Sequence, residues 1–204
     1  MKILKIKNID LNFTKKELEK GKVFVVPTDT SYGISGKIDS KVVTRIFKIK
    51  ERSQEKAMPV FVDKEIVEQI AIVDKRAKIL MTKFWPGPLT MVLTTNPPCK
   101  VGPCTVGQEG TVAVREPKNK LIRDILKIYK KPITATSANI SGKPSAYKPS
   151  EILNYFAKSK ITPDYFIDAG VLPQKPVSTI IDLTDKLKIL REGEIKFEDI
   201  KKEL

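Results

Sequence analysis

The sequence predicts an α/β fold in which one twisted, mixed β-sheet is flanked by helices, within a single domain covering residues 1–204. Short apolar runs rich in β-branched residues, such as 23–26 and 111–115, are typical of buried strands. The segment 42–49 instead repeats its apolar residues at helical spacing. Because strand and helix signals follow one another without strict alternation, a mixed sheet is favoured over a doubly wound one.

The first half of the chain is expected to contain three strands and four helices. Each helix should begin after a side chain that accepts backbone hydrogen bonds. The expected elements are strands at 3–6, 23–26 and 58–62, and helices capped by Asn12 or Thr14, by Asp39 or Ser40, by Asp63 and by Asp74.

The second half is expected to contain six strands and three helices. The strands are placed at 89–95, 111–115, 132–135, 165–168, 178–183 and 187–191, and the helices at 119–130, 149–156 and 198–204. Between the first two strands, residues 96–110 hold three prolines, three glycines and both cysteines, which predicts a loop. Cys99 and Cys104 have no second cysteine pair with which to build a metal site, so we expect plain thiols.

The chain contains no histidine, and this count restricts its chemistry more than any other. It excludes histidine-based catalytic triads, histidine proton shuttles and most zinc sites. Residues 1–7 alternate apolar residues with lysine, a strand pattern that no signal-peptide apolar block follows. No apolar run is long enough to span a bilayer, so we expect a cytoplasmic protein without a membrane partner.

The net charge of +14 comes mainly from lysines spread over the whole chain, which favours a lysine-rich surface over a dedicated polyanion site. Arginine is scarcer, with six residues in all. Its planar fork matches phosphate and carboxylate better than lysine does. Arg52, Arg115 and Arg191 each end a regular segment and precede a loop containing glycine, proline or serine, so they are the first candidates for ligand contacts.

Polar side chains gather where the predicted strands end. The apolar run 23–26 is followed by Pro27 and then by three hydroxyls, a carboxylate, a phenol and a glycine. Similar chemistry is expected at Arg115, at 136–145, at Ser178 and Thr179, at Arg191, and at a helix end bearing Lys50, Arg52 and Lys56. Strand ends of open α/β sheets are common ligand sites. Together these groups predict a pocket for an anionic ligand that works by positioning and charge stabilisation, as in phosphoryl or nucleotidyl transfer. The chain has no Walker A motif and no G-x-G-x-x-G.

Seven segments occur in the order seen in the YrdC-like family of threonylcarbamoyl-AMP synthases: PTDTSYG, KERSQEK, FWPGPLT, TVAVR, TSANISG, STIID and LREG. The resemblance covers about residues 22–193, and the length resembles the short form of the family. It implies a twisted α/β sheet with a concave basic cavity. It also implies that L-threonine, bicarbonate or CO2, and ATP are converted to threonylcarbamoyl-AMP and pyrophosphate, with Mg²⁺ accompanying ATP. Other proteins would then transfer the threonylcarbamoyl group to adenosine 37 of tRNA.

The resemblance also assigns roles to individual residues. Lys50 and Arg52 match the family's catalytic Lys-x-Arg pair. Contacts to threonine are implied for Thr30, Tyr32, Arg115, Ala135 and Ser178. Contacts to ATP are implied for Arg52, Lys56, Thr111, Ser137, Asn139, Ser145 and Arg191, and no metal ligand is implied. Thr28, Asp29 and Ser31 are expected only to shape their turn.

Three alternatives remain at the level of sequence. A module that binds double-stranded RNA or tRNA would use the positive charge, although no basic and aromatic interleaving is present. The stretch GVLPQKPVSTIIDLTD resembles a paralogous branch without assured synthase activity, but that branch tends to lack the intact SANISG found here. The third alternative is a carbamoyltransferase-type role, because a related module occurs in hydrogenase-maturation proteins; those carry acylphosphatase-like and zinc-finger segments that this chain lacks.

Overall fold

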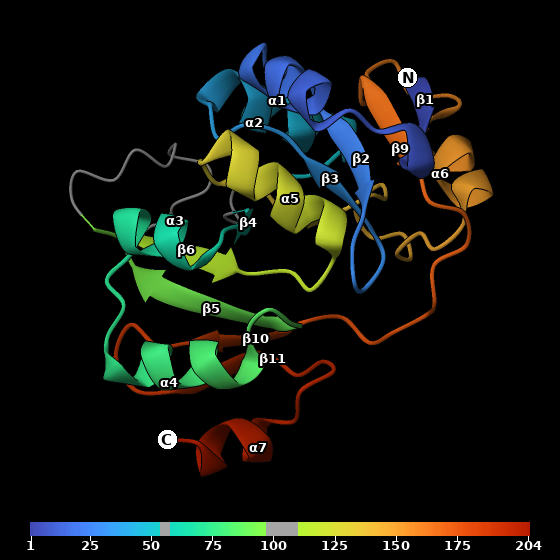
Figure 1. The fold of residues 1–204 in the computed structure, drawn as a ribbon. Helices are drawn as coiled ribbons and strands as arrows, with labels where there is room; N and C mark the ends of the chain where they lie inside the picture. The colour runs from blue at the N-terminus through green and yellow to red at the C-terminus, as the bar shows by residue number, and fades with distance from the viewer. Residues whose placement is uncertain (54–57, 97–109) are drawn as a thin grey trace.

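The computed structural model describes residues 1–53, 58–96 and 110–204, which form two mixed β-sheets with helices around and between them (Figure 1). The predicted mixed α/β architecture is confirmed, but the strands divide into two sheets where the sequence predicted one. In the described part of the chain, the helices are too short or too polar for any of them to traverse a lipid bilayer.

The first sheet contains the strands β1 (Lys2–Lys5), β2 (Phe24–Pro27), β3 (Tyr32–Ser35), β8 (Thr136–Ser137) and β9 (Tyr165–Asp168). Their order is β1-β9-β2-β3-β8. β9 runs parallel to both β1 and β2, whereas β3 is antiparallel to both β2 and β8. The apolar run that follows Lys22 therefore lies in the middle of this sheet.

The second sheet contains the strands β4 (Val60–Phe61), β5 (Leu89–Thr94), β6 (Thr111–Arg115), β7 (Ile133–Thr134), β10 (Thr179–Asp182) and β11 (Lys188–Arg191). Their order is β11-β10-β5-β6-β4-β7. β10 is parallel to β5 and β4 is parallel to β6, while the remaining pairs are antiparallel. A single residue, Ala135, separates β7 from β8 and so carries the chain from one sheet to the other.

The helices begin largely where the sequence predicts. They are α1 (Leu11–Glu19), α2 (Ser40–Ile49), α3 (Lys64–Ile70), α4 (Lys75–Phe84), α5 (Lys120–Tyr129), α6 (Pro149–Phe156) and α7 (Phe197–Lys202), with a short 3-10 turn at Ile6–Asn8. Caps at Asp39, Asp63 and Asp74 are confirmed. The cap of α1 is Asp10, whose carboxylate accepts the N–H groups of Asn12 and Phe13, so the predicted cap at Asn12 or Thr14 was wrong.

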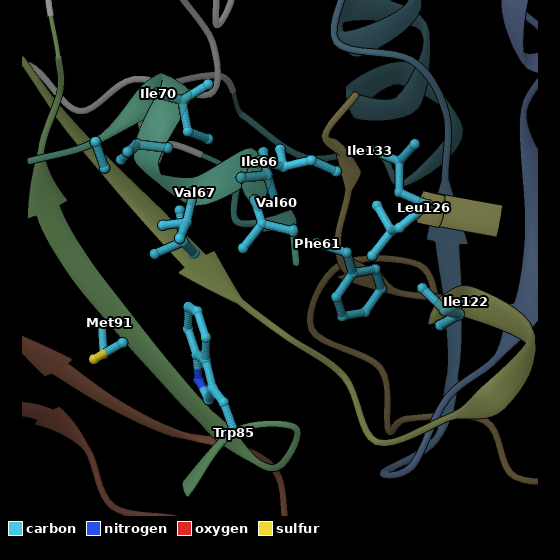
Figure 2. Close-up of a cluster of buried hydrophobic side chains, with 14 of the residues drawn as sticks. Val60, Phe61, Ile66, Val67, Ile70, Trp85, Met91, Ile122, Leu126 and Ile133 are labelled. Carbon is cyan, nitrogen blue, oxygen red and sulfur yellow. The ribbon is translucent and has the colours of Figure 1, made fainter. Parts of the chain in front are cut away.

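Helix α5 fills the space between the two sheets (Figure 1). Its residues Ile122 and Leu126 belong to one buried cluster with Phe24 of β2 and Val60 of β4. Figure 2 shows part of this cluster around Trp85. On the other face of the first sheet, a second cluster joins β2, β3 and β9 to α2 and α6. The two sheets are therefore held together by one shared core.

Strand β3 was not predicted, because Gly33 interrupts its apolar pattern and its first residue lies in a polar stretch. The structure explains the glycine by close packing. A Cβ at Gly33 would lie 3.1 Å from Thr28 Cγ2 and 3.2 Å from the carbonyl oxygen of Thr136. The polar stretch is therefore a tight hairpin turn between two buried strands rather than an open loop.

Candidate functional site

Alternate residues along several strands of the second sheet face a cavity on one side of that sheet. On β5, Thr90 and Val92 line the cavity, whereas Leu89, Met91 and Leu93 are buried in the core. The same alternation on the neighbouring strands adds Thr111, Ala113, Arg115, Ser178 and Ile180 to the cavity wall. The period-two pattern of these strands thus separates the site from the core.

The cavity has a volume of about 570 Å³, within the range of small-molecule sites. Among the described residues of its wall are three arginines and no carboxylate. Ten residues predicted to contact a substrate lie together in this wall: Thr30, Tyr32, Arg52, Thr111, Arg115, Ala135, Ser137, Ser145, Ser178 and Arg191. The predicted residues Lys50 and Asn139 are not part of the wall. Lys56, Cys99 and Cys104 lie outside the described residues.

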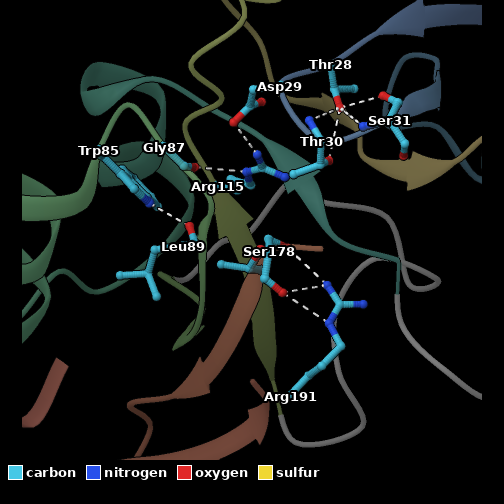
Figure 3. A network of polar contacts seen from close by, with 11 residues as sticks. Thr28, Asp29, Thr30, Ser31, Trp85, Gly87, Leu89, Arg115, Ser178 and Arg191 are labelled. Atoms are coloured by element: carbon cyan, nitrogen blue, oxygen red, sulfur yellow. Dashed lines mark hydrogen bonds and ion pairs between the residues drawn. The ribbon is translucent and has the colours of Figure 1, made fainter. Parts of the chain in front are cut away.

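The turn between β2 and β3 is closed by Thr28. Its hydroxyl donates to the carbonyl oxygen of Ser31 at 2.6 Å and accepts the N–H groups of Thr30 and Ser31, both at 3.1 Å (Figure 3). Thr28 shapes the turn as predicted, but Thr28 and Ser31 also line the cavity, so the expectation that they only shape the turn was wrong. The Thr30 hydroxyl lies 3.1 Å from that of Thr28 and lines the cavity.

Arg115 ends β6 with its guanidinium held on two sides (Figure 3). Its Nε donates to the carbonyl oxygen of Gly87 at 3.0 Å, and its Nη2 donates to Asp29 Oδ2 at 2.5 Å. The side chains of Arg115 and Asp29 are only 7% and 12% exposed, so this ion pair is nearly dry. Burial lowers the pKa of Arg115, and the charge of Asp29 opposes that shift. Asp29 therefore does more than shape its turn, which corrects the sequence-based expectation.

Arg52 lines the cavity just beyond the end of α2. Its guanidinium lies 5.5 Å from the centre of the Phe47 ring, a cation–π contact that holds the side chain. Burial lowers the pKa of Arg52, but an arginine remains charged at neutral pH. The segment that follows α2 thus presents a cation to the cavity.

Lys50 is not part of the cavity wall but binds the SAN loop (residues 136–145), which is. Its Nζ donates to the carbonyl oxygens of Ser137 and Asn139 at 2.5 and 3.0 Å, and to Asn139 Oδ1 at 2.8 Å. Ser137 Oγ also donates to Asn139 Oδ1 at 2.6 Å, and Asn139 Nδ2 donates to the carbonyl oxygen of Lys143. Lys50 is only 2% exposed, so its ammonium acts on the cavity through this loop.

Burial and the neighbouring Arg52 lower the pKa of Lys50 to about 7. An unfolded chain, with an ordinary lysine pKa near 10.4, then binds more protons than the folded protein between pH 7 and about 10. The penalty from burying Lys50 is therefore complete below pH 7 and is relieved as the pH rises through this window.

We expect the free energy of unfolding of the wild type, relative to Lys50→Met, to increase between pH 7 and 9 by up to about 1.4 kcal/mol per pH unit. Urea titrations at each pH measure this difference. Lys48→Met, which alters an exposed lysine in the last turn of α2, is the matched control and should show no such trend. A pH-independent difference would mean that the oxygen acceptors around Nζ balance the effect of burial.

Tyr32 and Ala135 line the cavity, but each already has one polar group hydrogen-bonded within the protein. The Tyr32 hydroxyl donates to the carbonyl oxygen of Gly170 at 2.7 Å and accepts from the N–H of Ala169 at 3.1 Å. It therefore has no hydrogen left to donate to a ligand. The N–H of Ala135 donates to the carbonyl oxygen of Pro59, so a ligand could meet only its carbonyl oxygen.

Arg191 is folded onto Ser178 (Figure 3). Its Nε and Nη2 donate to the carbonyl oxygen of Ser178 at 3.1 and 2.8 Å, and Nη2 also reaches Ser178 Oγ at 3.0 Å. Gly193 permits the close approach of this segment to Ser178, because a Cβ at position 193 would lie 2.1 Å from the carbonyl oxygen of Val177. Burial and the nearby charge of Arg115 lower the pKa of Arg191. Two cations thus lie close enough to interact, which favours an anion between them.

The residues that line the cavity do not form a magnesium site of their own. Mg²⁺ prefers carboxylate, phosphate and water oxygens, whereas the described wall supplies guanidinium and hydroxyl groups. No group of three or more acidic, cysteine or histidine side chains is arranged around a metal position in the described part of the chain.

Sequence reasoning missed three residues that shape the site. Asp29 was visible as a carboxylate in a strand-end loop, but nothing local indicated its pairing with Arg115, 86 residues away. Thr90 lies inside a predicted strand, and its alternation with buried neighbours is the signal that places it on the opposite face. Gly193 follows Arg191 by two residues, and nothing in the local sequence indicates how closely its backbone approaches that of Val177.

Comparisons with known proteins match most of the chain. The family model Sua5_yciO_yrdC, described as telomere recombination, matches residues 16–193. A Methanocaldococcus jannaschii protein is 37% identical over 193 residues, covering 93% of this chain and 88% of the relative. The threonylcarbamoyl-AMP synthase of Pyrococcus abyssi is 36% identical over 192 residues, which are 91% of this chain and 54% of that protein.

Two solved structures share the fold. P. abyssi Sua5 complexed with L-threonine superposes with a TM-score of 0.90 and 31% identity, covering 100% of this chain and 61% of that one. Escherichia coli YciO gives a TM-score of 0.83 and 26% identity, with 98% of both chains covered. The chain thus spans little more than half of the P. abyssi protein but nearly all of YciO. By the extent of these matches, the chain belongs to the Sua5/YciO/YrdC family.

Proposed function

We propose that the protein is an L-threonylcarbamoyladenylate synthase, which makes threonylcarbamoyl-AMP and pyrophosphate from L-threonine, bicarbonate or CO2, and ATP. The observation that carries this proposal is the cavity, whose described wall combines three arginines with hydroxyls and no carboxylate. Such a wall suits two anions, an amino-acid carboxylate and a nucleotide triphosphate. The curated relatives named as this synthase support the same reaction.

The reaction needs positioning and charge stabilisation more than a protein base. The threonine amine attacks CO2 to form a carbamate and releases its proton to solvent. A carbamate oxygen then attacks the α-phosphorus of ATP, and the bond to the β-phosphate oxygen breaks to release pyrophosphate. Arg52 and Arg191 would offset the charge that develops on the phosphates, which is the largest contribution a preorganised site can make. This chemistry is compatible with a chain that has no histidine.

Threonine and ATP would occupy different parts of the cavity. We assign the threonine carboxylate to the guanidinium of Arg115, with Thr30, Ser178 and the Ala135 carbonyl oxygen around the amino acid. ATP would contact Thr111, Ser137, Ser145 and Arg191. Lys50 and Asn139 would position Ser137 rather than touch the nucleotide, because their polar atoms are bonded to the SAN loop.

Mg²⁺ would arrive bound to the ATP phosphates, because the described wall provides no carboxylate to hold it. We also propose that the product is passed to tRNA-modification partners for attachment at position 37 of tRNA, and that this takes place in the cytoplasm. The positive surface could add weak, salt-dependent attraction for RNA.

Pyrophosphate release tests the proposed reaction directly. We expect release from ATP to require both L-threonine and bicarbonate, with threonylcarbamoyl-AMP detected by mass spectrometry. ATP turnover indifferent to both compounds would contradict the proposal. Tight RNA binding without any threonine-dependent turnover would instead support the RNA-binding alternative, and inactivity with both substrates and with RNA would support the paralogous branch.

A further inference from the structure

Two buried hydroxyls face the cavity beside the guanidinium of Arg115. Thr90 Oγ1 and Ser178 Oγ lie 3.0 Å apart, and the two residues are 3% and 7% exposed. Both line the cavity. Thr90 and Arg115 lie on neighbouring antiparallel strands, one residue beyond the Met91–Val114 pair, so their side chains belong to the same face of the sheet. We refer to Thr90 and Ser178 as the hydroxyl pair.

Hydrogen counting shows what the hydroxyl pair offers to a ligand. Arg191 Nη2 donates to Ser178 Oγ at 3.0 Å, so one lone pair of this oxygen is already used. Thr90 and Ser178 share one hydrogen between them, whichever of the two donates. The other hydroxyl hydrogen has no acceptor within the described part of the chain. One O–H is therefore available to the cavity, in a nearly dry position.

A buried donor of this kind discriminates between ligands. A ligand oxygen placed against the hydroxyl pair completes its hydrogen bonding, whereas a methyl group in the same place leaves the donor unsatisfied. Sites built to bond a substrate hydroxyl therefore reject analogues that lack it far more strongly than an apolar pocket rejects an extra methylene.

We infer that Thr90 is a specificity-determining residue that, with Ser178, recognises the side-chain hydroxyl of a β-hydroxy amino acid. This inference rests on the proposed function, because it takes the amino acid to be bound with its carboxylate at Arg115. The hydroxyl pair lies beside Arg115, which suits a small amino acid whose carboxylate and side-chain oxygen are contacted at once. Arg191 keeps the pair in a donating arrangement by occupying Ser178 Oγ.

The test compares L-threonine with L-2-aminobutyrate, which lacks only the hydroxyl, and with L-serine, which lacks only the methyl. In the wild type, we expect kcat/KM for threonine to exceed that for 2-aminobutyrate by at least about 100-fold. Thr90→Val keeps the side-chain volume but removes the hydroxyl that is bonded to Ser178, so the remaining Ser178 O–H loses the partner that orients it; the ratio should fall about 10-fold or more, through a higher KM for threonine. The threonine-to-serine ratio and the KM for ATP should stay unchanged.

Thr94→Val is the matched control, because Thr94 is an exposed threonine on the same strand and outside the cavity wall. It should leave both substrate ratios as in the wild type. An unchanged threonine-to-2-aminobutyrate ratio in Thr90→Val would overturn the inference. A raised KM for ATP with a constant amino-acid ratio would also overturn it, by showing that the hydroxyl pair serves to position Arg191. A wild type that neither binds nor turns over threonine would instead reject the proposed function itself.

Discussion

Arg52→Ala is expected to lower kcat/KM for threonine-dependent pyrophosphate release by at least about 10²–10³-fold. The guanidinium lines the cavity beyond the end of α2, where it can offset charge that develops on the ATP phosphates. Because Arg52 packs on the Phe47 ring and makes further contacts, the free energy of unfolding should also fall, while the variant stays folded. Pyrophosphate assays and urea unfolding of the same preparation measure the two effects.

Arg45→Ala is the matched control for this variant. Arg45 is 33% exposed and bonds Asp164 and the carbonyl oxygen of Thr162, outside the cavity wall. We expect it to retain turnover while losing some stability. If Arg52→Ala is largely unfolded, Arg52 has a structural role and its assignment to the phosphates is wrong.

Arg115→Ala should both destabilise the protein and abolish threonine binding. It leaves the Asp29 carboxylate nearly buried without its cation, and breaking such a pair from one side costs about 3–5 kcal/mol. Asp29 Oδ1 already lacks a hydrogen-bond partner in the described part of the chain, so the loss of Arg115 would leave both oxygens unpaired. Chemical unfolding and calorimetric titration with L-threonine measure the two losses.

A double variant separates these two roles of Arg115. Asp29→Asn combined with Arg115→Met removes both charges, and we expect it to recover most of the lost stability while threonine binding stays absent. Recovered threonine binding in the double variant would contradict the assignment of the carboxylate to Arg115. A double variant as unstable as Arg115→Ala would show that Gly87 and the cavity wall, rather than the ion pair, depend on this side chain.

The candidate site could be predicted from the sequence where a local rule places a residue. Arg115 and Arg191 end strands and Arg52 follows a helix, and all three line the cavity. Lys50 shows the limit of such rules. It lies two residues before Arg52, yet Glu51 adopts a positive φ of 49° between them, so the two cations diverge. Arg52 lines the cavity while Lys50 binds the SAN loop from behind.

The α/β class, most helix starts and the three cavity arginines follow from local sequence, because periodicity, capping and strand-end chemistry are properties of neighbouring residues. The division of the strands into two sheets does not, since pairing such as β5 with β10 joins residues about 90 positions apart. Only the tertiary structure decides that Asp29 holds Arg115 and that Thr90 meets Ser178. These contacts depend on register between distant strands, and no local pattern encodes that register.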